Sequence, residues 1–353
     1  MPQLSIHMIL HSDEQTKYLP FLFESLQKQT FTDYEFVLID NSSGSSVISV
    51  AENELKKIGR PYRVLDAGGN VGFAVGHNLA YKNTRTPYFL LLNPDMYLQS
   101  NVLENMVRFL DEHYDTSNVS VRLMRWDFDQ GLEGFSNDVD AIGIRLFRNR
   151  RAVEWLTREE WKKDSENSDV RKIFDKPAIE VFGASGAFVM YRRSCIEHLL
   201  LPEQSLFDPT YHSYKEDLDL AYRLRNAGFT SYVLLDTVAY HDRTGAGPRN
   251  LGDVAAIKNK KTQPYYVSFH SYKNHIRTLY KNEYWQNFLL DAPFILWYEI
   301  KKLGFLLLTS PKVVLLGWKE IFAHFGYTRA ARKAIHKTRK NHYQGIRRWF
   351  LFE

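Results

Sequence analysis

The sequence predicts an α/β fold in which a mostly parallel sheet is flanked by helices, followed by a helical C-terminal extension. Three observations support this prediction. Short apolar runs alternate with segments whose apolar residues recur at three- and four-residue spacing, which is typical of strand–helix–strand units. Polar residues follow the apolar runs, where the carboxyl ends of parallel strands form a ligand crevice. Beyond residue 265 the alternation stops and aromatic, helix-like segments begin.

The N-terminal part contains the clearest alternation. Strands are predicted at residues 4–10 and 35–39, with a helix across residues 18–29 between them. A unit of this length implies parallel strands joined by a right-handed crossover. The pattern continues with a helix at Val47–Ile58, a strand at 62–67, a helix at Gly76–Asn83 and a strand at 88–93.

Polar residues stand at the ends of three predicted strands. Ser12 follows the first strand, Asp40 ends the second, and Asn93 and Asp95 end the strand at 88–93. A single Asp in such a crevice can hold Mg²⁺ or Mn²⁺, because these hard ions bind through one or two protein carboxylates and substrate phosphates. The alternative is an Asn-Pro-Asp turn without a ligand.

A glycine-rich turn, GGNVGFAVGHN, spans Gly68–Asn78 between a strand and a helix. Glycines permit close backbone approach, and a helix N-terminus attracts phosphate. The spacing differs from the dinucleotide fingerprint and from the P-loop. The turn therefore indicates a nucleotide-diphosphate ligand, with an ordinary tight turn as the alternative.

Two adjacent carboxylates, Glu216 and Asp217, open a predicted helix that stops at Gly228. Carboxylates are favoured at helix N-termini by the helix dipole, which is the purely structural interpretation. A carboxylate there can also act as a general base directed into a cleft. His241 ends a further predicted strand before a Gly-containing loop, AYHDRTGAG at 239–247, and could complete a metal shell or remain structural.

The C-terminal segment, residues 265–353, is predicted to be helical, amphipathic and basic. Its apolar runs are interrupted by charges before they reach the ~18–20 residues of a spanning helix. Lys319–Glu353 carries nine Lys or Arg and two Glu. With Trp285, Trp297 and Trp318, this pattern favours a peripheral membrane surface. The alternatives are a soluble helical subdomain or a homodimer interface.

Composition sets the remaining bounds. The 353 residues are 44% hydrophobic and 25% charged, which excludes wholesale disorder. The single cysteine, Cys195, excludes a disulfide framework and favours a reducing compartment. No secretory signal is recognised, so the expected location is cytoplasmic, on the inner face of the cell membrane. Nucleic-acid binding is not expected, because the basic residues gather in the tail and not among surface aromatics.

Six segments occur in an informative order: VLIDNSS, NVGFAVGHN, LLLNPDM, FGASGAFVMYRRS, FDPTYHSYKEDLDLAYRLRNAG and AYHDRTGAG. With them the chain resembles, over about residues 4–280, the family 2 glycosyltransferases of the GT-A fold, a Rossmann-like nucleotide-binding fold. The similarity is greatest to the rhamnosyltransferase-like branch of bacterial polysaccharide biosynthesis. It implies a nucleotide-sugar-binding half at 1–121, an acceptor-binding and catalytic half at 122–264, and an extension at 265–353.

The resemblance also implies roles for individual residues. Asp217 would be the catalytic base, and Asp95 and His241 the protein ligands of Mg²⁺ or Mn²⁺. Asn93 stands where the family's Asp-x-Asp motif has its first Asp, which leaves one carboxylate for the metal. The donor would contact Ser12, Asp40, Asn70, Gly72, Phe73, Asn78, Asn93 and Asp95. The acceptor is expected to contact Ser185, Gly186, Glu216 and Arg223. Arg223 is included because it follows Glu216 by about two helical turns, and the alternative is a solvated arginine on the helix face.

The predicted function is inverting transfer of a sugar, L-rhamnose from dTDP-rhamnose or a related deoxyhexose, to a hydroxyl of a growing lipid-linked glycan. A UDP-hexose or UDP-galactofuranose transferase is the alternative within the family. A catalytically silent scaffold at the membrane surface is the alternative outside enzymes. A sugar-1-phosphate nucleotidyltransferase is disfavoured, because LHSDEQ follows the first strand in place of a basic glycine-rich loop.

Overall fold

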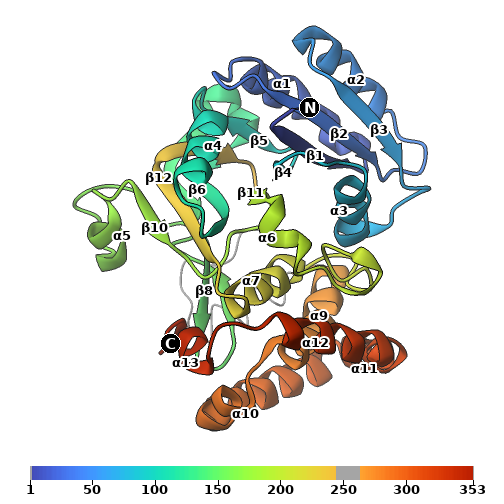
Figure 1. The fold of residues 1–353 in the computed structure, drawn as a ribbon, viewed down its shortest axis with the longest axis vertical. Coiled ribbons are helices and arrows are strands. Elements are labelled where there is room, and N and C mark those ends of the chain that lie inside the picture. Colours follow the sequence, from blue (N-terminus) through green and yellow to red (C-terminus); the bar gives the residue numbers. More distant parts are fainter. Residues whose placement is uncertain (1, 244–262, 353) are drawn as a thin grey trace.

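The structure is a computed structural model that describes residues 2–243 and 263–352. Within these residues the main element is a ten-stranded sheet in the order β10-β12-β6-β11-β4-β1-β2-β3, with β5 beside β12 and β7 beside β6. Figure 1 shows this sheet with the C-terminal helices packed against one end of the domain. The predicted α/β class, with helices on both faces of the sheet and a helical C-terminal region, is confirmed. The sheet is mixed: β4, β1, β2 and β3 are parallel, as are β6 and β12, and its other pairings are antiparallel.

The N-terminal half follows the predicted alternation closely. Strands β1, β2, β3 and β4 pair in parallel, because each is joined to the next by a helix that crosses over the sheet. The elements are β1 (Leu4–Leu10), η1 (Asp13–Lys17), α1 (Leu19–Gln27), β2 (Tyr34–Asp40), α2 (Val47–Ile58), β3 (Tyr62–Asp66), α3 (Gly72–Lys82) and β4 (Tyr88–Leu92).

Helix α3 begins at Gly72, four residues before the predicted start at Gly76. The glycines there resembled an extended turn, but residues 73–75 are apolar and continue the helix. The glycine-rich turn is therefore shorter than predicted, and much of it is the first turn of a helix.

The second half completes the same sheet. Residue 121, where the sequence divides the two halves, lies inside β6, so both halves share one sheet. The elements are β5 (Met96–Leu98), α4 (Val102–Glu112), β6 (Thr116–Trp126), η2 (Phe128–Gly134), β7 (Phe135–Ala141), β8 (Ile144–Phe147), β9 (Ala152–Glu154), α5 (Ser168–Ile173), β10 (Ala178–Glu180), β11 (Phe188–Arg192), α6 (Arg193–Glu197), η3 (Pro202–Gln204), α7 (Glu216–Asn226) and β12 (Thr230–His241).

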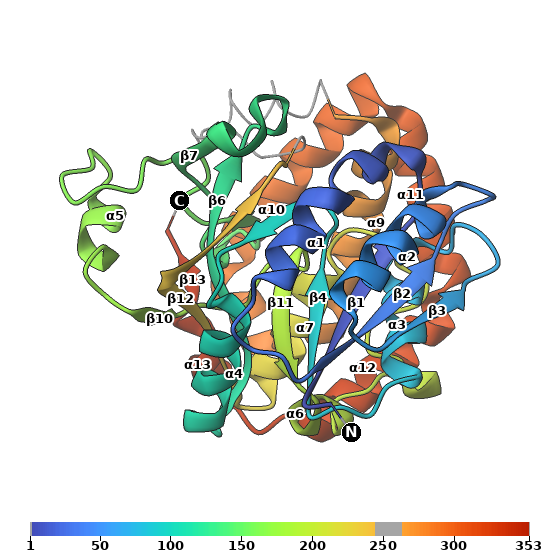
Figure 2. The ribbon, with the colours of Figure 1, turned by 90° about the horizontal axis from the view of Figure 1, so that it is seen from above.

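Both faces of this mixed sheet are buried by helices. One face packs against α1, α2 and α4, and Figure 2 shows these helices in front of the strands. The other face packs against α3, α6 and α7, where Leu220 and Leu224 of α7 meet Val189 of β11. Helix α7, which carries the predicted base, is thus fixed by its apolar face on the sheet.

The C-terminal region is a helical layer against α7. It consists of α9 (Tyr265–Asn282), α10 (Trp285–Thr309), α11 (Pro311–Ala323), α12 (Phe325–Thr338), α13 (Tyr343–Arg347) and β13 (Phe350–Leu351). Strand β13 pairs in parallel with β8, which returns the chain to the catalytic part. Among the described residues, the structure contains no helix with the length and apolarity needed to span a membrane.

The basic residues at the end of the chain are partly used in folding. Arg347 Nη1 lies 3.0 Å from Asp291 Oδ2, and Arg339 Nη2 donates to the carbonyl oxygen of Asn282 at 2.6 Å. The segment is therefore a folded part of the helical layer and not an extended tail, although Lys333 and Lys337 remain exposed.

Candidate active site

A cleft of about 1320 Å³ crosses the carboxyl ends of β1, β2 and β4 and continues between α7 and the C-terminal helices. Parallel strands place their carboxyl ends at one edge of the sheet, so residues that are distant in sequence meet there. The predicted site residues that line it are Ser12, Asn70, Gly72, Phe73, Asn93, Asp95, Ser185, Gly186, Glu216, Asp217 and His241.

The glycine-rich turn is held rigidly at one end of this cleft. Asn41, which follows β2, accepts a hydrogen bond from the Val71 amide at 2.8 Å and donates to the Asn70 side chain at 3.2 Å. Asn70 Oδ1 in turn accepts from the Gly72 amide at 3.1 Å. Sequence analysis missed Asn41, although it directly follows the predicted strand.

Gly72 could not be replaced by a larger residue without rearrangement. Its φ is +81°, in the left-handed region that favours glycine. A Cβ atom there would lie 2.4 Å from Nδ1 of His212. Gly72 therefore brings the start of α3 against the loop that precedes α7, which joins the two sides of the cleft.

Two predicted donor contacts do not reach the cleft. The Asp40 carboxylate accepts hydrogen bonds from the Ser42 amide and hydroxyl at 3.0 and 2.7 Å, and Asp40 does not line the cleft. Asn78 is 5% exposed and bonds the backbone of Phe207 through both of its side-chain atoms. Asn78 is a structural residue because α3 begins early and carries it into the interior.

Asp95 and His241 are adjacent, as the sequence predicted for metal ligands. Strand β12 pairs antiparallel with β5 and sets His241 opposite Met96, while the Asp242 amide donates to the Asp95 carbonyl at 3.0 Å. His241 Nε2 lies 3.4 Å from Asp95 Oδ2. Asp95 Oδ1 is buried and has no hydrogen-bond partner among the described residues.

A third residue, Asp140 of β7, fixes the imidazole. Its Oδ2 lies 2.8 Å from His241 Nδ1. Burial disfavours a charged imidazole, but Asp95 and Asp140 together raise the pKa of His241 to about 10. The carboxylate on Nδ1 orients the ring, as in many metal-binding histidines, and Nε2 faces Asp95. Sequence analysis missed Asp140, because β7 lies in a segment without clear periodicity.

These residues fit a divalent cation held in part by its substrate. Asp95 and His241 offer one oxygen and one nitrogen ligand, and Mg²⁺ is commonly bound through one or two carboxylates plus substrate phosphates. No cluster of three or more metal-binding side chains is found in residues 2–243 and 263–352. Asn93 also lines the cleft, and its backbone N–H donates to the Ala187 carbonyl oxygen at 2.9 Å.

The two carboxylates at the start of α7 have different environments. Asp217 Oδ1 accepts from the Leu218 amide at 2.7 Å and Oδ2 from the Gly186 amide at 3.3 Å. Glu216 is 7% exposed, and its Oε2 has no partner among the described residues. Burial, with Asp217 beside it, raises the pKa of Glu216 well above its usual range. Asp217 is thus the carboxylate that is open to the cleft.

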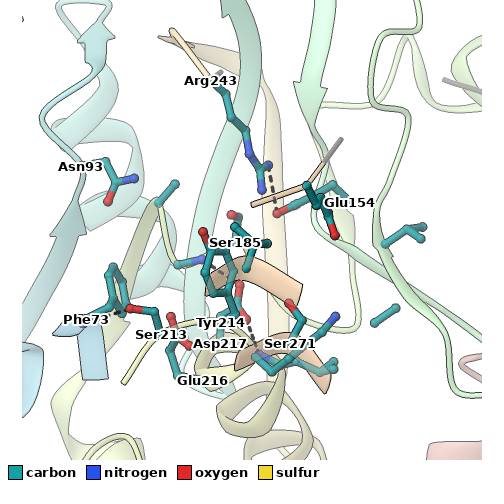
Figure 3. A pocket seen from close by; sticks show the side chains of 18 of the residues that line it. Phe73, Asn93, Glu154, Ser185, Ser213, Tyr214, Glu216, Asp217, Arg243 and Ser271 are labelled. Carbon is teal, nitrogen blue, oxygen red and sulfur yellow. Dashed lines mark hydrogen bonds and ion pairs between the residues drawn. The ribbon is translucent and has the colours of Figure 1, made fainter. Parts of the chain in front are cut away.

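Figure 3 shows Asp217 between two groups of side chains, with Asn93 and Phe73 on one side and Glu154 and Ser271 on the other. The segment that contains Ser185 and Gly186 lies beside it. A Cβ atom on Gly186 would lie 3.3 Å from Phe73 and 3.5 Å from the Cβ of Asp217. This close contact places the predicted base next to the wall formed by α3.

Arg223 is not an acceptor contact, contrary to the prediction. It is 1% exposed, its Nη1 donates to the Leu199 carbonyl at 2.7 Å, and its Nε lies 3.4 Å from Asp219. It follows Asp217 by six residues, and at about 100° per residue it faces away from the cleft. Its role is to hold the loop that packs under α7.

The structure adds an ion pair that the sequence did not indicate. Arg243 Nη1 lies 3.2 Å from Glu154 Oε1 and 3.9 Å from Asp140 Oδ2, and both Arg243 and Glu154 line the cleft. Arg243 lies within the AYHDRTGAG motif, two residues after His241, and could have been noticed there. Glu154 of β9 carried no signal. The remainder of the predicted loop, Thr244–Gly247, lies outside the described residues.

The arrangement is that of a GT-A enzyme. In a comparison with solved structures, the chain is similar to "Crystal structure of GalNAc-T7 with UDP, GalNAc and Mn2+", with a TM-score of 0.54 and 13% sequence identity, covering 80% of this chain and 49% of that one. Residues 5–200 of the 353 match glycosyl transferase family 2. The chain belongs to this family.

Two curated relatives share parts of the chain. Poly(ribitol-phosphate) beta-N-acetylglucosaminyltransferase TarS of Staphylococcus aureus strain Mu50 is 26% identical over 113 residues, which cover 31% of this chain and 20% of the relative. Glycosyltransferase GlyG of Streptococcus pneumoniae serotype 4 is 24% identical over 144 residues, covering 39% of this chain and 47% of GlyG. The chain therefore spans less than half the length of each.

Proposed function

We propose that this chain transfers a sugar from a nucleoside-diphosphate donor to a hydroxyl of a cell-envelope polymer, with inversion at the anomeric carbon. One observation carries the proposal: a single cleft holds both Asp217 and the Asp95–His241 pair. The names of the relatives, an N-acetylglucosaminyltransferase and a teichoic acid polymerase of Staphylococcus epidermidis among them, support an envelope polymer as the product.

Inversion requires one base and no covalent intermediate. The acceptor hydroxyl attacks the anomeric carbon through an oxocarbenium-like state as the bond to the diphosphate breaks. Asp217 takes the hydroxyl proton, and the Gly186 amide keeps the Oδ2 of this carboxylate in place. Burial raises the pKa of Glu216 and favours its neutral form, which can donate a hydrogen bond to the acceptor.

The departing diphosphate gains negative charge on the face of the sugar opposite the attacking hydroxyl. Asp95 and His241 would hold Mg²⁺ or Mn²⁺, which when bound offsets charge on the leaving group. Asp140 keeps the Nε2 atom of His241 directed at that site. Arg243, which lines the same cleft, adds a permanent positive charge.

The donor can be identified by thermal unfolding. The sequence motifs favour dTDP-rhamnose, the names of the relatives favour UDP-N-acetylglucosamine, and UDP-galactofuranose completes the panel. We expect one of these to raise the Tm with Mn²⁺ present, because a ligand that binds only the folded state stabilises it. In Asp95→Ala the Mn²⁺-dependent part of this rise should be lost.

Asp164→Ala is the matched control, because Asp164 is exposed and lies outside the cleft. It should retain the wild-type response to donor and Mn²⁺. A donor shift that is unaffected by EDTA and equal in Asp95→Ala would contradict the metal assignment. Binding without transfer or hydrolysis of any donor would support a silent scaffold in place of an enzyme.

We also propose that the C-terminal layer rests on an anionic membrane surface on the cytoplasmic side. Large apolar side chains are exposed along α10 and α11, among them Trp285 at 66%, Ile300 at 62% and Leu308 at 89%. Exposed lysines Lys301 and Lys312 lie on the same two helices. Apolar side chains beside basic ones are the pattern of helices that lie in a lipid interface.

Vesicle binding checks this surface. The double substitution Ile300→Glu and Leu308→Glu should lower binding to phosphatidylglycerol-containing vesicles at least about tenfold, since each apolar side chain contributes roughly 1.5–3 kcal/mol when buried. Leu132→Glu, at a leucine 43% exposed in the catalytic part, should bind as the wild type does. A dimer in solution that the double substitution dissociates would instead assign the surface to a second copy.

A further inference from the structure

The cleft extends beyond the groups used in the proposed mechanism. Past Asp217 it continues between α7 and the helices α9 and α10, where it is lined by Lys215, Lys302, His275, Tyr272 and Leu306. These residues come from segments outside the family match at 5–200. No step of the proposed reaction requires a cation at this end.

Lys215 is the most informative residue of this region. It immediately precedes α7 with a φ of +72°, and Tyr214 before it has a φ of +69°. Left-handed conformations are uncommon for such residues and cluster at functional sites. This backbone sets the lysine beside the two carboxylates that open α7 and inside the cleft.

The Lys215 ammonium has no hydrogen bond or close ion pair with any residue in the part of the chain that the structure describes. Burial lowers its pKa, and Asp217, Glu154 and Glu216 act in the opposite direction. A desolvated cation without a direct partner is costly, so an anion that fills this space would be bound strongly.

A second cation reinforces the first from the opposite wall. Lys302 of α10 is 9% exposed, and its Nζ lies 2.7 Å from Glu299 Oε2. Glu299 Oε1 lies 2.9 Å from His275 Nε2. The positive charges of Lys302 and Lys215 repel each other. Arg151, which also lines the cleft, repels Lys215 as well. Glu299 is engaged by Lys302 and His275, so it does not pair with Lys215, whose nearby carboxylates are Asp217, Glu154 and Glu216.

The surrounding wall is aromatic and apolar. Tyr272 and Leu306, both 5% exposed, belong to one apolar cluster between α9 and α10. A wall of this kind limits water and strengthens the attraction between charges. The donor diphosphate is assigned to the other side of Asp217, at Asp95 and His241, so the anion at Lys215 must come from a different molecule.

We propose that Lys215, with Lys302 opposite, binds a phosphate group of the acceptor, a phosphodiester or a diphosphate a few bonds from the attacking hydroxyl. This inference rests on the proposed function, because it is the transferase reaction that requires an acceptor beside Asp217. The subsite makes the enzyme selective for phosphate-bearing acceptors over neutral glycans.

The test is calorimetric titration of the wild-type protein with its donor site filled by a saturating nucleoside diphosphate and Mn²⁺. Two probes distinguish the source of the phosphate: glycerophosphoglycerol for a phosphodiester polymer, and geranyl diphosphate for a lipid carrier. We expect one probe to bind, and Lys215→Met to weaken its Kd at least tenfold. Lys215→Arg, which keeps the charge, should restore most of the affinity.

Lys312→Met is the matched control, because Lys312 is exposed on α11 and outside the cleft. It should bind the probe within twofold of the wild type. If the nucleotide binds but neither probe does, or if Lys215→Met binds the probe as well as the wild type, the subsite is contradicted and the proposed function stands. Failure of every nucleoside diphosphate to bind would contradict both.

Discussion

Asp217→Asn is expected to reduce the rate of sugar transfer by about 10²–10⁴-fold, the usual contribution of a positioned general base. Asparagine keeps the size of the side chain and can still accept from the Gly186 amide, but it cannot take the proton of the acceptor hydroxyl. The loss should fall on kcat, with the donor Kd close to the wild-type value. Initial rates at saturating donor and acceptor measure it.

Two comparisons sharpen this prediction. Glu216→Gln should cause a smaller loss, because burial raises the pKa of Glu216 and favours its neutral form, and glutamine has nearly the same shape. Asp164→Asn, at an exposed position, is the control for the substitution itself. If a folded Asp217→Asn variant turned over at the wild-type rate, Asp217 would not be the base.

Lys281→Met is expected to cause the largest loss of stability, about 3–5 kcal/mol, the usual result of removing one partner from a buried ion pair. Lys281 Nζ lies 2.7 Å from Asp208 Oδ2 and 3.0 Å from Asp219 Oδ1, and all three side chains are at most 1% exposed. The substitution leaves two buried carboxylates, each with one remaining cation: Arg277 lies 3.3 Å from Asp208, and Arg223 lies 3.4 Å from Asp219.

Chemical denaturation checks this value, with Lys333→Met, at an exposed lysine of α12, as the matched control. The wild type should also lose stability in acid. Burial opposes ionisation of Asp208, but Lys281 and Arg277 lower its pKa from 3.8 to about 2. A lowered carboxyl pKa adds to the free energy of unfolding above pH 4. This contribution is lost as the pH falls from about 4 to 2. Equal stability of Lys281→Met and Lys333→Met would contradict the role of the network.

The fold was predictable because hydrophobic periodicity is a local property. The spacing of apolar residues predicted α2 at Val47–Ile58, and the apolar run at 4–10 predicted β1, each with the observed bounds. The edge of the sheet that forms the site followed from the parallel topology alone. All eight predicted donor positions are strand ends or glycine-turn residues, but position in a turn does not determine where a side chain points. That is why Asp40 and Asn78 were misassigned.

The parts that could not be predicted depend on long-range pairing. Asp140 reaches His241 only because β7 and β12 both pair with β6, and no local pattern in residues 135–141 indicates this. Glu154 meets Arg243 for a similar reason. Arg223 shows the converse: its sequence distance from Asp217 was known, but its burial depends on the loop at Leu199 and Leu206 that covers it.

The pairing of β13 with β8 limits how far the site can move relative to the C-terminal helices. The helical layer is joined to the preceding part of the chain at several places, among them Lys281 beneath α7, Glu283 and Asp291 beside Arg150, and Phe350 beside Leu146. These separate attachments prevent the layer from turning as a hinged arm. If α10 and α11 rest on a bilayer, Asp217 lies at a fixed distance from the lipid surface. Only acceptor hydroxyls at that distance from the membrane can then be glycosylated.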